Sequence, residues 1–131
     1  MLSVEFLVKV DKRMKESIVK QKAFDFSIEA IDVYKLLLAQ NEYVLSKQFL
    51  RAATSIGANV NEALAGFSKK DFAAKMSISS KEARETLYWV ELLEYAQFVE
   101  YDFQSLKNKT EELIKMLTSI VKTTQQNIKG N

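Results

Sequence analysis

The stretch VLSKQFLRAATSIGANVNEALAG, residues 44–66, decides the fold. Its apolar residues recur in steps of three and four, the spacing of one face of an α-helix. These residues are Leu45, Phe49, Ala52, Ile56, Val60 and Ala63. Gly66 follows the last of them, at the position where a glycine commonly ends a helix. The pattern therefore predicts a helix over about residues 44–64.

Helical spacing predicts three further helices around this one. One spans about residues 24–40, and residues 14–22 could extend it backwards. Ser68 followed by Asp71 resembles a capping box, with Asp in place of the usual Glu, and predicts a helix from there to about Ala96. Asp102 can cap a fourth helix, which Gly130 closes. The expected core residues are Phe24, Ile28, Ile31, Val33, Tyr34, Leu37 and Leu38; Phe72, Met76, Ser79, Ala83, Thr86, Leu87, Val90 and Leu93; and Leu106, Leu113, Leu117, Ile120, Val121 and Ile128.

Short connections between long helices make sequence neighbours antiparallel. We therefore expect an all-α protein, an up-down-up-down antiparallel four-helix bundle formed by residues 14–131. Residues 1–13 are expected to be a tail or a short added strand. Their apolar run is short, and charges follow it where a signal peptide would carry charges first. No apolar stretch approaches the ~20 residues that span a bilayer, so we expect a cytoplasmic protein with no membrane association.

The missing residue types narrow the chemistry that the chain can perform. Histidine and cysteine are absent, which excludes an imidazole base, a thiolate metal site and a disulfide. With three glycines the chain has no Gly-rich phosphate loop. Neighbouring carboxylates could still serve an acid–base or Mg²⁺-dependent enzyme, namely Glu82 with Glu85, Glu91 with Glu94, and Glu111 with Glu112. Such pairs on helices more commonly form a solvated face, so we expect no catalytic residue, metal ligand or cofactor.

Several short stretches between Met14 and Val99 carry a family resemblance: residues 46–51 (SKQFLR), 54–59 (TSIGAN), Glu62, 68–72 (SKKDF) and 81–89 (KEARETLYW). In these the sequence resembles the bacterial four-helix-bundle proteins encoded in intervening sequences of 23S rRNA genes. The resemblance implies the same bundle, often assembled as a five-membered ring (a pentamer), with no established catalytic residues. The sequence is also similar to the accessory protein of diversity-generating retroelements, which binds a reverse transcriptase and nucleic acid.

A polar stripe shares the second helix with the apolar one. Its members step by four, four and three, and they are Arg51, Ser55, Asn59 and Glu62. One hypothesis is a ligand or phosphate site built around Arg51. The favoured alternative is a structural polar network, in which Arg51 pairs with Glu82 or Glu85 and Asn59 fixes the register of the helices.

The net charge of +2 is unevenly distributed along the chain. Antiparallel helices should gather at one end the basic residues Lys15, Lys20, Lys22, Lys69, Lys70, Lys75, Lys122 and Lys129. The other end should hold Glu42, Glu91, Glu94, Glu100, Asp102, Glu111 and Glu112. A basic end is typical of proteins that bind phosphate backbones, and the predicted nucleic-acid-binding residues are Lys20, Lys22, Lys69, Lys70, Lys75 and Lys122. The alternative is that these lysines only keep the protein soluble.

The second half of the third helix is apolar on nearly every side. Leu87, Val90 and Leu93 are expected to face the core. The remaining residues predict an oligomer interface formed by Tyr88, Trp89, Leu92 and Tyr95, since tyrosine and tryptophan are favoured in interfaces. In the alternative, neighbouring helices of the same subunit cover this side completely.

Three functions follow from these patterns. The first is a non-catalytic, ring-forming helical protein whose basic rim binds RNA or an RNA–protein complex. The second is an interaction scaffold or adaptor for a protein partner, with no nucleic-acid role. A carboxylate-dependent enzyme is the third and the least supported.

Overall fold

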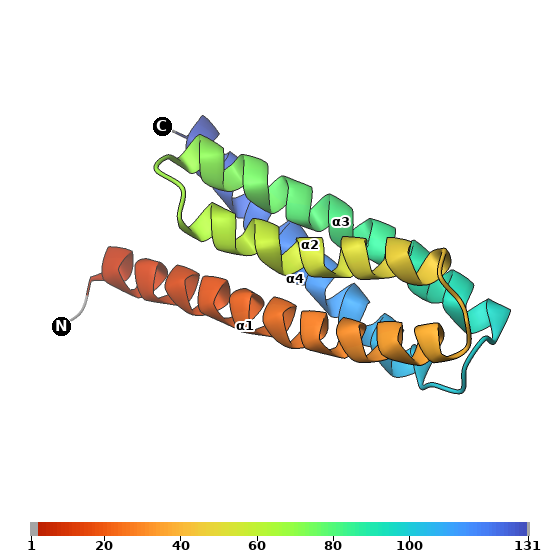
Figure 1. The fold of residues 1–131 in the computed structure, drawn as a ribbon. Coiled ribbons are helices and arrows are strands. Elements are labelled where there is room, and N and C mark those ends of the chain that lie inside the picture. Colours follow the sequence, from red (N-terminus) through yellow and green to blue (C-terminus); the bar gives the residue numbers. More distant parts are fainter. Residues whose placement is uncertain (1–2, 131) are drawn as a thin grey trace.

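The computed structural model describes residues 3–130, which form four helices and no strand. The helices are α1 (Val4–Ala39), α2 (Leu45–Leu64), α3 (Lys69–Ala96) and α4 (Phe103–Lys129). Consecutive helices run in opposite directions and pack along their lengths, so the predicted antiparallel bundle is confirmed (Figure 1). The seam between α1 and α4 has the sparsest contacts, whereas α3 packs extensively on both α2 and α4.

Helix α1 begins about twenty residues earlier than the pattern of large apolar residues predicted. The expected tail or added strand at residues 1–13 is wrong for residues 4–13, which are helical, while residues 1–2 lie outside the described part of the chain. Ser3 caps the helix by accepting a hydrogen bond from the Phe6 backbone N–H, and Glu5 complements the helix dipole in the first turn. At about 1.5 Å per residue, α1 is roughly 54 Å long and extends beyond the end of α2 (Figure 1).

The core face of α1 also differs from the expected one. Phe24 and Ile28 were expected in the core, yet they are 59% and 48% exposed. The buried residues of this helix are Val19, Ala23, Phe26, Ala30, Val33 and Leu37. Small residues explain why a different face of α1 is buried. Gly57 of α2 lies so close to Ala23 that a Cβ added to the glycine would be 3.6 Å from the Cβ of Ala23. The two backbones pack closely there, which larger side chains at both positions would prevent.

Helices α2, α3 and α4 contribute the faces that the sequence predicted, with small differences. All the expected residues of α2 are buried except Leu45, which is half-buried. In α3, Ala73 replaces Phe72 on the buried face, and in α4 the buried set also includes Phe103, Thr110 and Thr124. The side chains of Ser68 and Asp102 cap α3 and α4 as predicted, by accepting from the backbone N–H groups of Asp71 and Ser105.

Glu42 forms a cap that the sequence did not reveal. Its carboxylate accepts hydrogen bonds from the backbone N–H groups of Val44, Leu45 and Ser46 at 3.0, 2.8 and 2.7 Å, which places it at the N-terminus of α2. Glu42 is only 8% exposed. Burial alone would raise the pKa of Glu42, but these hydrogen bonds outweigh it and lower the pKa.

Candidate nucleic-acid interface

Three segments that are distant in sequence meet at one end of the bundle: the start of α1, the α2–α3 turn and the end of α4 (Figure 1). Residues 3–24, 62–75 and 118–130 together carry eleven basic and five acidic residues. The rest of the chain carries eight basic and twelve acidic residues. The bundle is therefore electrically polarised along its axis. We call the positive end the basic pole.

The predicted lysines divide into two groups in the structure. Lys22 forms an ion pair with Glu112 at 2.8 Å, and Lys75 forms one with Glu62 at 2.7 Å, so a carboxylate already neutralises each. Four of the predicted residues are exposed and make no ion pair within residues 3–130: Lys20, Lys69, Lys70 and Lys122. These four remain available to an anionic ligand.

A cavity of about 200 Å³ lies at the basic pole and joins its three segments. Lys12 comes from α1, Ser68 and Lys69 from the start of α3, and Thr124 and Asn127 from the end of α4. Hydroxyl, amide and ammonium groups at the N-terminus of a helix are a suitable environment for a phosphate group. The cavity is large enough for a small anion but too small for a base pair.

Two residues at this end were missed in the sequence. Lys12 was assigned to the tail, but its ammonium lies 5.5 Å from the ring centre of Phe72, a cation–π contact between α1 and the start of α3. Phe67 was unassigned, and in the α2–α3 turn its side chain is fully exposed beside Ser68 and Lys69. Only the position of Phe67 in a short polar turn could have indicated its exposure, since other elements seldom bury the side chains of such turns.

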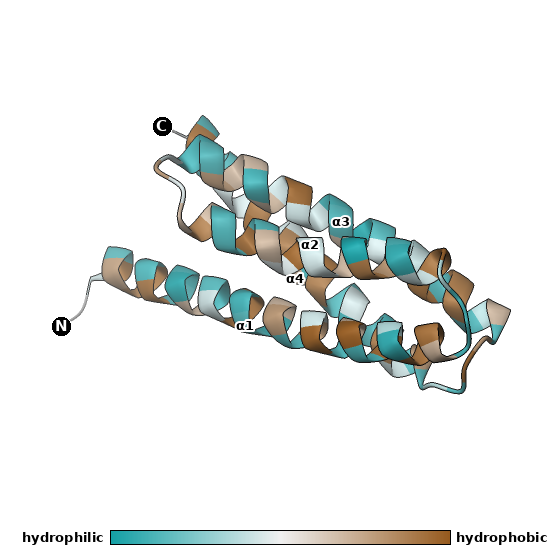
Figure 2. Ribbon diagram, in the orientation of Figure 1, coloured by the Kyte–Doolittle hydropathy of each residue, from teal (hydrophilic) through white to brown (hydrophobic). Residues whose placement is uncertain are grey.

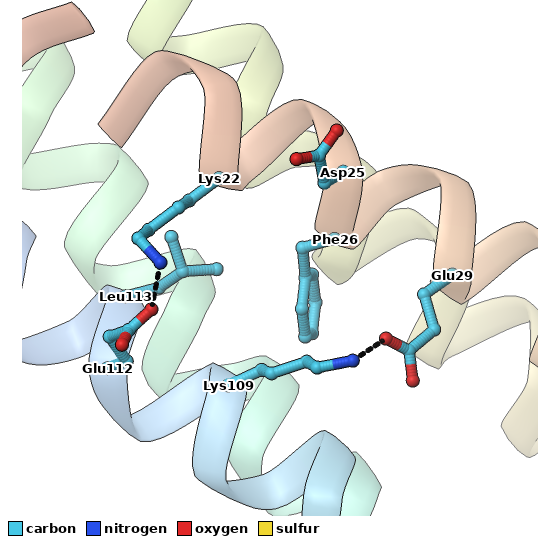
Figure 3. A pocket seen from close by; sticks show the side chains of 7 residues that line it. All are labelled: Lys22, Asp25, Phe26, Glu29, Lys109, Glu112 and Leu113. Atoms are coloured by element: carbon cyan, nitrogen blue, oxygen red, sulfur yellow. Dashed lines mark hydrogen bonds and ion pairs between the residues drawn. The ribbon is translucent and has the colours of Figure 1, made fainter. Parts of the chain in front are cut away.

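A second cavity, of about 270 Å³, lies in the loose seam between α1 and α4 (Figure 3). The ion pairs of Lys22 with Glu112 and of Lys109 with Glu29 lie on either side of the Phe26 ring (Figure 3). The Tyr101 hydroxyl also donates to Glu29, and burial together with this hydrogen bond raises the pKa of Tyr101. The residues that line the cavity carry two basic and three acidic groups, so the cavity has no surplus of positive charge for an anion.

The structure brings Arg51 of α2 together with both Glu82 and Glu85 of α3. Its guanidinium contacts Glu85 at 2.7 Å and Glu82 at 3.3 Å. The hydrogen bond from Arg51 lowers the pKa of Glu85, and the same contact raises the pKa of Arg51. All the charge that Arg51 could offer to a phosphate is therefore already paired.

The other members of the polar stripe form separate contacts. The Ser55 hydroxyl donates to the Arg51 carbonyl, and the Asn59 amide donates to the Ser55 carbonyl, both within α2. These bonds do not reach α3 and do not set the register between helices. A different residue does so, because the buried Ser79 hydroxyl of α3 donates to the Ile56 carbonyl of α2 at 2.8 Å.

We expect Arg51→Ala to lower the free energy of unfolding by only about 0.5–1 kcal/mol, because half-exposed ion pairs are screened by solvent. The Arg51 side chain is 51% exposed. Urea denaturation of the variant, with Arg84→Ala as the control, measures this change. Loss of the folded state would instead indicate that Arg51 is central to packing.

The aromatic residues of α3 do not form one uniform exposed face. Tyr88 and Tyr95 are 57% and 88% exposed, whereas Trp89 and Leu92 are half-buried. The Trp89 indole N–H is buried and makes no hydrogen bond within residues 3–130. It nevertheless lies close enough to Glu85 to contribute to the lowered pKa of that carboxylate. The aromatic surface available to a partner therefore centres on the two tyrosines.

The carboxylate pairs do not converge into a metal site. Within residues 3–130, no group of three or more aspartates and glutamates is placed to hold a metal ion. Glu82 and Glu85 pair with Arg51, and Glu112 pairs with Lys22. In the same part of the chain, no helix is long and apolar enough to cross a membrane.

Two comparisons with known proteins find relatives. A family model described as "23S rRNA-intervening sequence protein" matches residues 15–119. A crystal structure of a protein of unknown function from the S23 ribosomal protein family of Bacteroides thetaiotaomicron is similar, with 43% sequence identity and a TM-score of 0.79. The match covers 82% of this chain and 98% of that protein. Among curated proteins, no match was found.

Proposed function

Because this chain belongs to the 23S rRNA-intervening sequence protein family, and the similar crystal structure is of a protein of unknown function, we propose its function from the basic pole. We propose that it is a non-catalytic, oligomeric helical-bundle protein that binds the phosphate backbone of RNA through this pole. The observation that carries the proposal is the set of exposed lysines without ion pairs, from α1, the start of α3 and α4, at one end of a polarised bundle.

Lysines favour backbone contact over base reading. Their ammonium groups act as point charges and lack the fixed fork with which arginine recognises a base edge. Neutralised phosphates release counterions, so the binding should be independent of sequence and sensitive to salt. The exposed Phe67 adds a surface on which an unpaired base can stack, which favours single-stranded RNA over a duplex.

An oligomer would strengthen weak contacts of this kind. We propose a homo-oligomer, a ring with five members in the form that the family resemblance implies. If its subunits are parallel, each contributes its basic pole to the same rim. One RNA strand can then contact several poles, and the effective concentration of the second pole raises the overall affinity.

Charge reversal tests the proposal. We expect Lys69→Glu with Lys70→Glu and Lys122→Glu to weaken binding of a mixed-sequence single-stranded RNA by at least about tenfold, since several phosphate contacts are lost. The measurement is fluorescence anisotropy of labelled RNA at low salt.

The matched control carries the same change of charge elsewhere. Lys81→Glu with Lys107→Glu and Lys115→Glu alters the net charge equally but leaves the basic pole unchanged. It should alter the affinity by no more than about threefold, the residual effect of net charge at a distance. Equal losses in both variants would show that net charge alone matters, and the proposed site would be wrong.

A second candidate is a scaffold that binds a protein partner and has no role with nucleic acid. The exposed Tyr88 and Tyr95 favour it, because tyrosine is enriched in protein interfaces. The two candidates differ in one simple observation. Absence of RNA binding even at low salt would leave the scaffold as the better reading.

A further inference from the structure

Helix α1 has a second apolar face, which points away from the bundle. Its residues follow a heptad spacing of three and four, as in a coiled-coil seam. The first position of each heptad is occupied by Leu7, Met14, Gln21 and Ile28. The fourth position is occupied by Val10, Ser17, Phe24 and Ile31. Six of these eight residues are apolar, and we call the eight the α1 seam.

The α1 seam is exposed to water although it is largely apolar. Leu7, Val10, Met14, Phe24 and Ile28 are each between 36% and 59% exposed. At 100° per residue they lie roughly opposite the buried face formed by Ala23, Phe26 and Ala30. Apolar residues recur along α1 as far as its N-terminal turns (Figure 2). A helix that is apolar on two opposite faces needs a second covering surface.

Charges on the two sides of the α1 seam indicate what covers it. The position before each heptad is occupied by Phe6, Arg13, Lys20 and Ser27, of which Arg13 and Lys20 are basic. The position on the other side is occupied by Asp11, Ile18, Asp25 and Asp32, of which three are acidic. In a parallel pair of helices, each such position faces the opposite side of its neighbour, one heptad on. Lys20 of one copy would then face Asp25 of the next, the one pair of opposite charge among the four such contacts.

An antiparallel pair would place like charges together. Basic positions would face basic positions, and acidic would face acidic, which is destabilising. Lys20 makes no ion pair within residues 3–130 of its own chain, so it is free for such a contact. In the oligomer Lys20 would then pair with Asp25, and Lys69, Lys70 and Lys122 would remain for RNA. We propose that the α1 seam is the surface through which copies of this chain associate, with their α1 helices parallel.

This arrangement names the surface of the proposed oligomer and therefore rests on self-association, but it does not rest on RNA binding. Parallel α1 helices bring the basic poles of neighbouring copies to the same end. Their mutual repulsion opposes assembly, and a bound polyanion would relieve it. The seam and the basic pole can nevertheless be tested separately, because the tests below contain no RNA.

Cysteine cross-linking tests the direction of the helices. The natural chain has no cysteine, so Met14→Cys introduces a single thiol. In a parallel seam, equivalent residues lie side by side within disulfide distance, about 4.4–6.8 Å between Cα atoms. Mild oxidation should then give a covalent dimer on a non-reducing gel. The control Lys81→Cys, exposed on α3, should remain monomeric on the gel.

An antiparallel seam would separate the two thiols. Position 14 would face a residue about ten positions further along, roughly 15 Å away. No dimer from Met14→Cys, or the same yield from both variants, would overturn the parallel arrangement.

The mass of the assembly tests the surface itself. Met14→Glu with Ile28→Glu places charges on the seam and should reduce the particle to the 15.0 kDa of one chain, measured by light scattering. Both side chains are about half exposed in the single chain, so circular dichroism should show unchanged helicity. Tyr88→Ser with Tyr95→Ser on α3 is the comparison. If only this second variant dissociates, if neither does, or if the natural protein is a monomer, the inference is wrong.

Discussion

Phe49→Ala should lower the free energy of unfolding by about 3–5 kcal/mol, a large part of the stability of a domain of this size. Phe49 of α2 is fully buried and has the largest side chain among the residues with no exposed surface. Truncation removes the aromatic ring from the core and leaves a cavity that rigid helices fill poorly. Urea denaturation monitored by circular dichroism at 222 nm gives the change in free energy.

The same substitution at an exposed position is the control. Phe67→Ala removes the identical group from the fully exposed turn between α2 and α3, and it should alter stability by no more than about 0.5 kcal/mol. Equal effects at Phe49 and Phe67 would mean that the buried side of α2 is not the centre of the core.

Glu42→Gln should lower the free energy of unfolding by about 1–3 kcal/mol at neutral pH, the range for hydrogen bonds to a charged group. Three backbone N–H groups at the start of α2 donate to this carboxylate, which also interacts with the helix dipole. Gln keeps one acceptor oxygen in nearly the same place, but its NH2 group cannot accept the remaining backbone N–H, and the negative charge is lost. Most of the loss should therefore come from electrostatics and not from packing.

The pH dependence of this effect follows from the lowered pKa of Glu42 in the folded state. The unfolded chain has a pKa near the ordinary value of 4.5, so the carboxylate contributes its full stabilisation above that pH. The contribution is lost as the pH falls below 4.5 through the lower pKa of the folded state. The difference between the natural protein and the variant should accordingly shrink in acid. Glu100→Gln, in the exposed α3–α4 connection, is the matched control for the loss of one carboxylate.

The sequence predicted the helices well where apolar spacing and caps agreed. Residues 44–64 carry six apolar residues in register, and the structure has α2 there almost unchanged. Ser68 and Asp102 begin the next two helices as their side chains suggested. These signals are local, so one stretch of sequence contains all that is needed to recognise them.

Prediction failed at several positions of α1 and α4 where small or polar residues face the core. Ala23 and Ala30 are buried because α2 packs closely against them, whereas the larger Phe24 and Ile28 attracted the prediction and point outward. Thr110 and Thr124 are buried in α4 with their hydroxyls bonded to carbonyls of the preceding turn. Burial of such residues depends on the distance between helices, which no single helix determines.

Partners in ion pairs were equally difficult to predict. Lys22 and Lys75 belong to basic stretches, but Glu112 and Glu62 on neighbouring helices neutralise them. Glu112 was predicted to lie at the acidic end of the bundle. It instead pairs with Lys22 of α1, which was predicted to lie at the basic end. Charge segregation along the chain predicts which end of a bundle is positive; it does not predict which side chains remain unpaired.

The salt dependence of RNA affinity tests the proposed function most directly. With three or more phosphate contacts, the dissociation constant of the natural protein for single-stranded RNA should rise about tenfold or more as salt increases from about 50 to about 200 mM. The triple charge reversal at Lys69, Lys70 and Lys122 should reduce this slope. An affinity that salt does not change, or no binding at the lowest salt, would contradict an RNA-binding role for the basic pole.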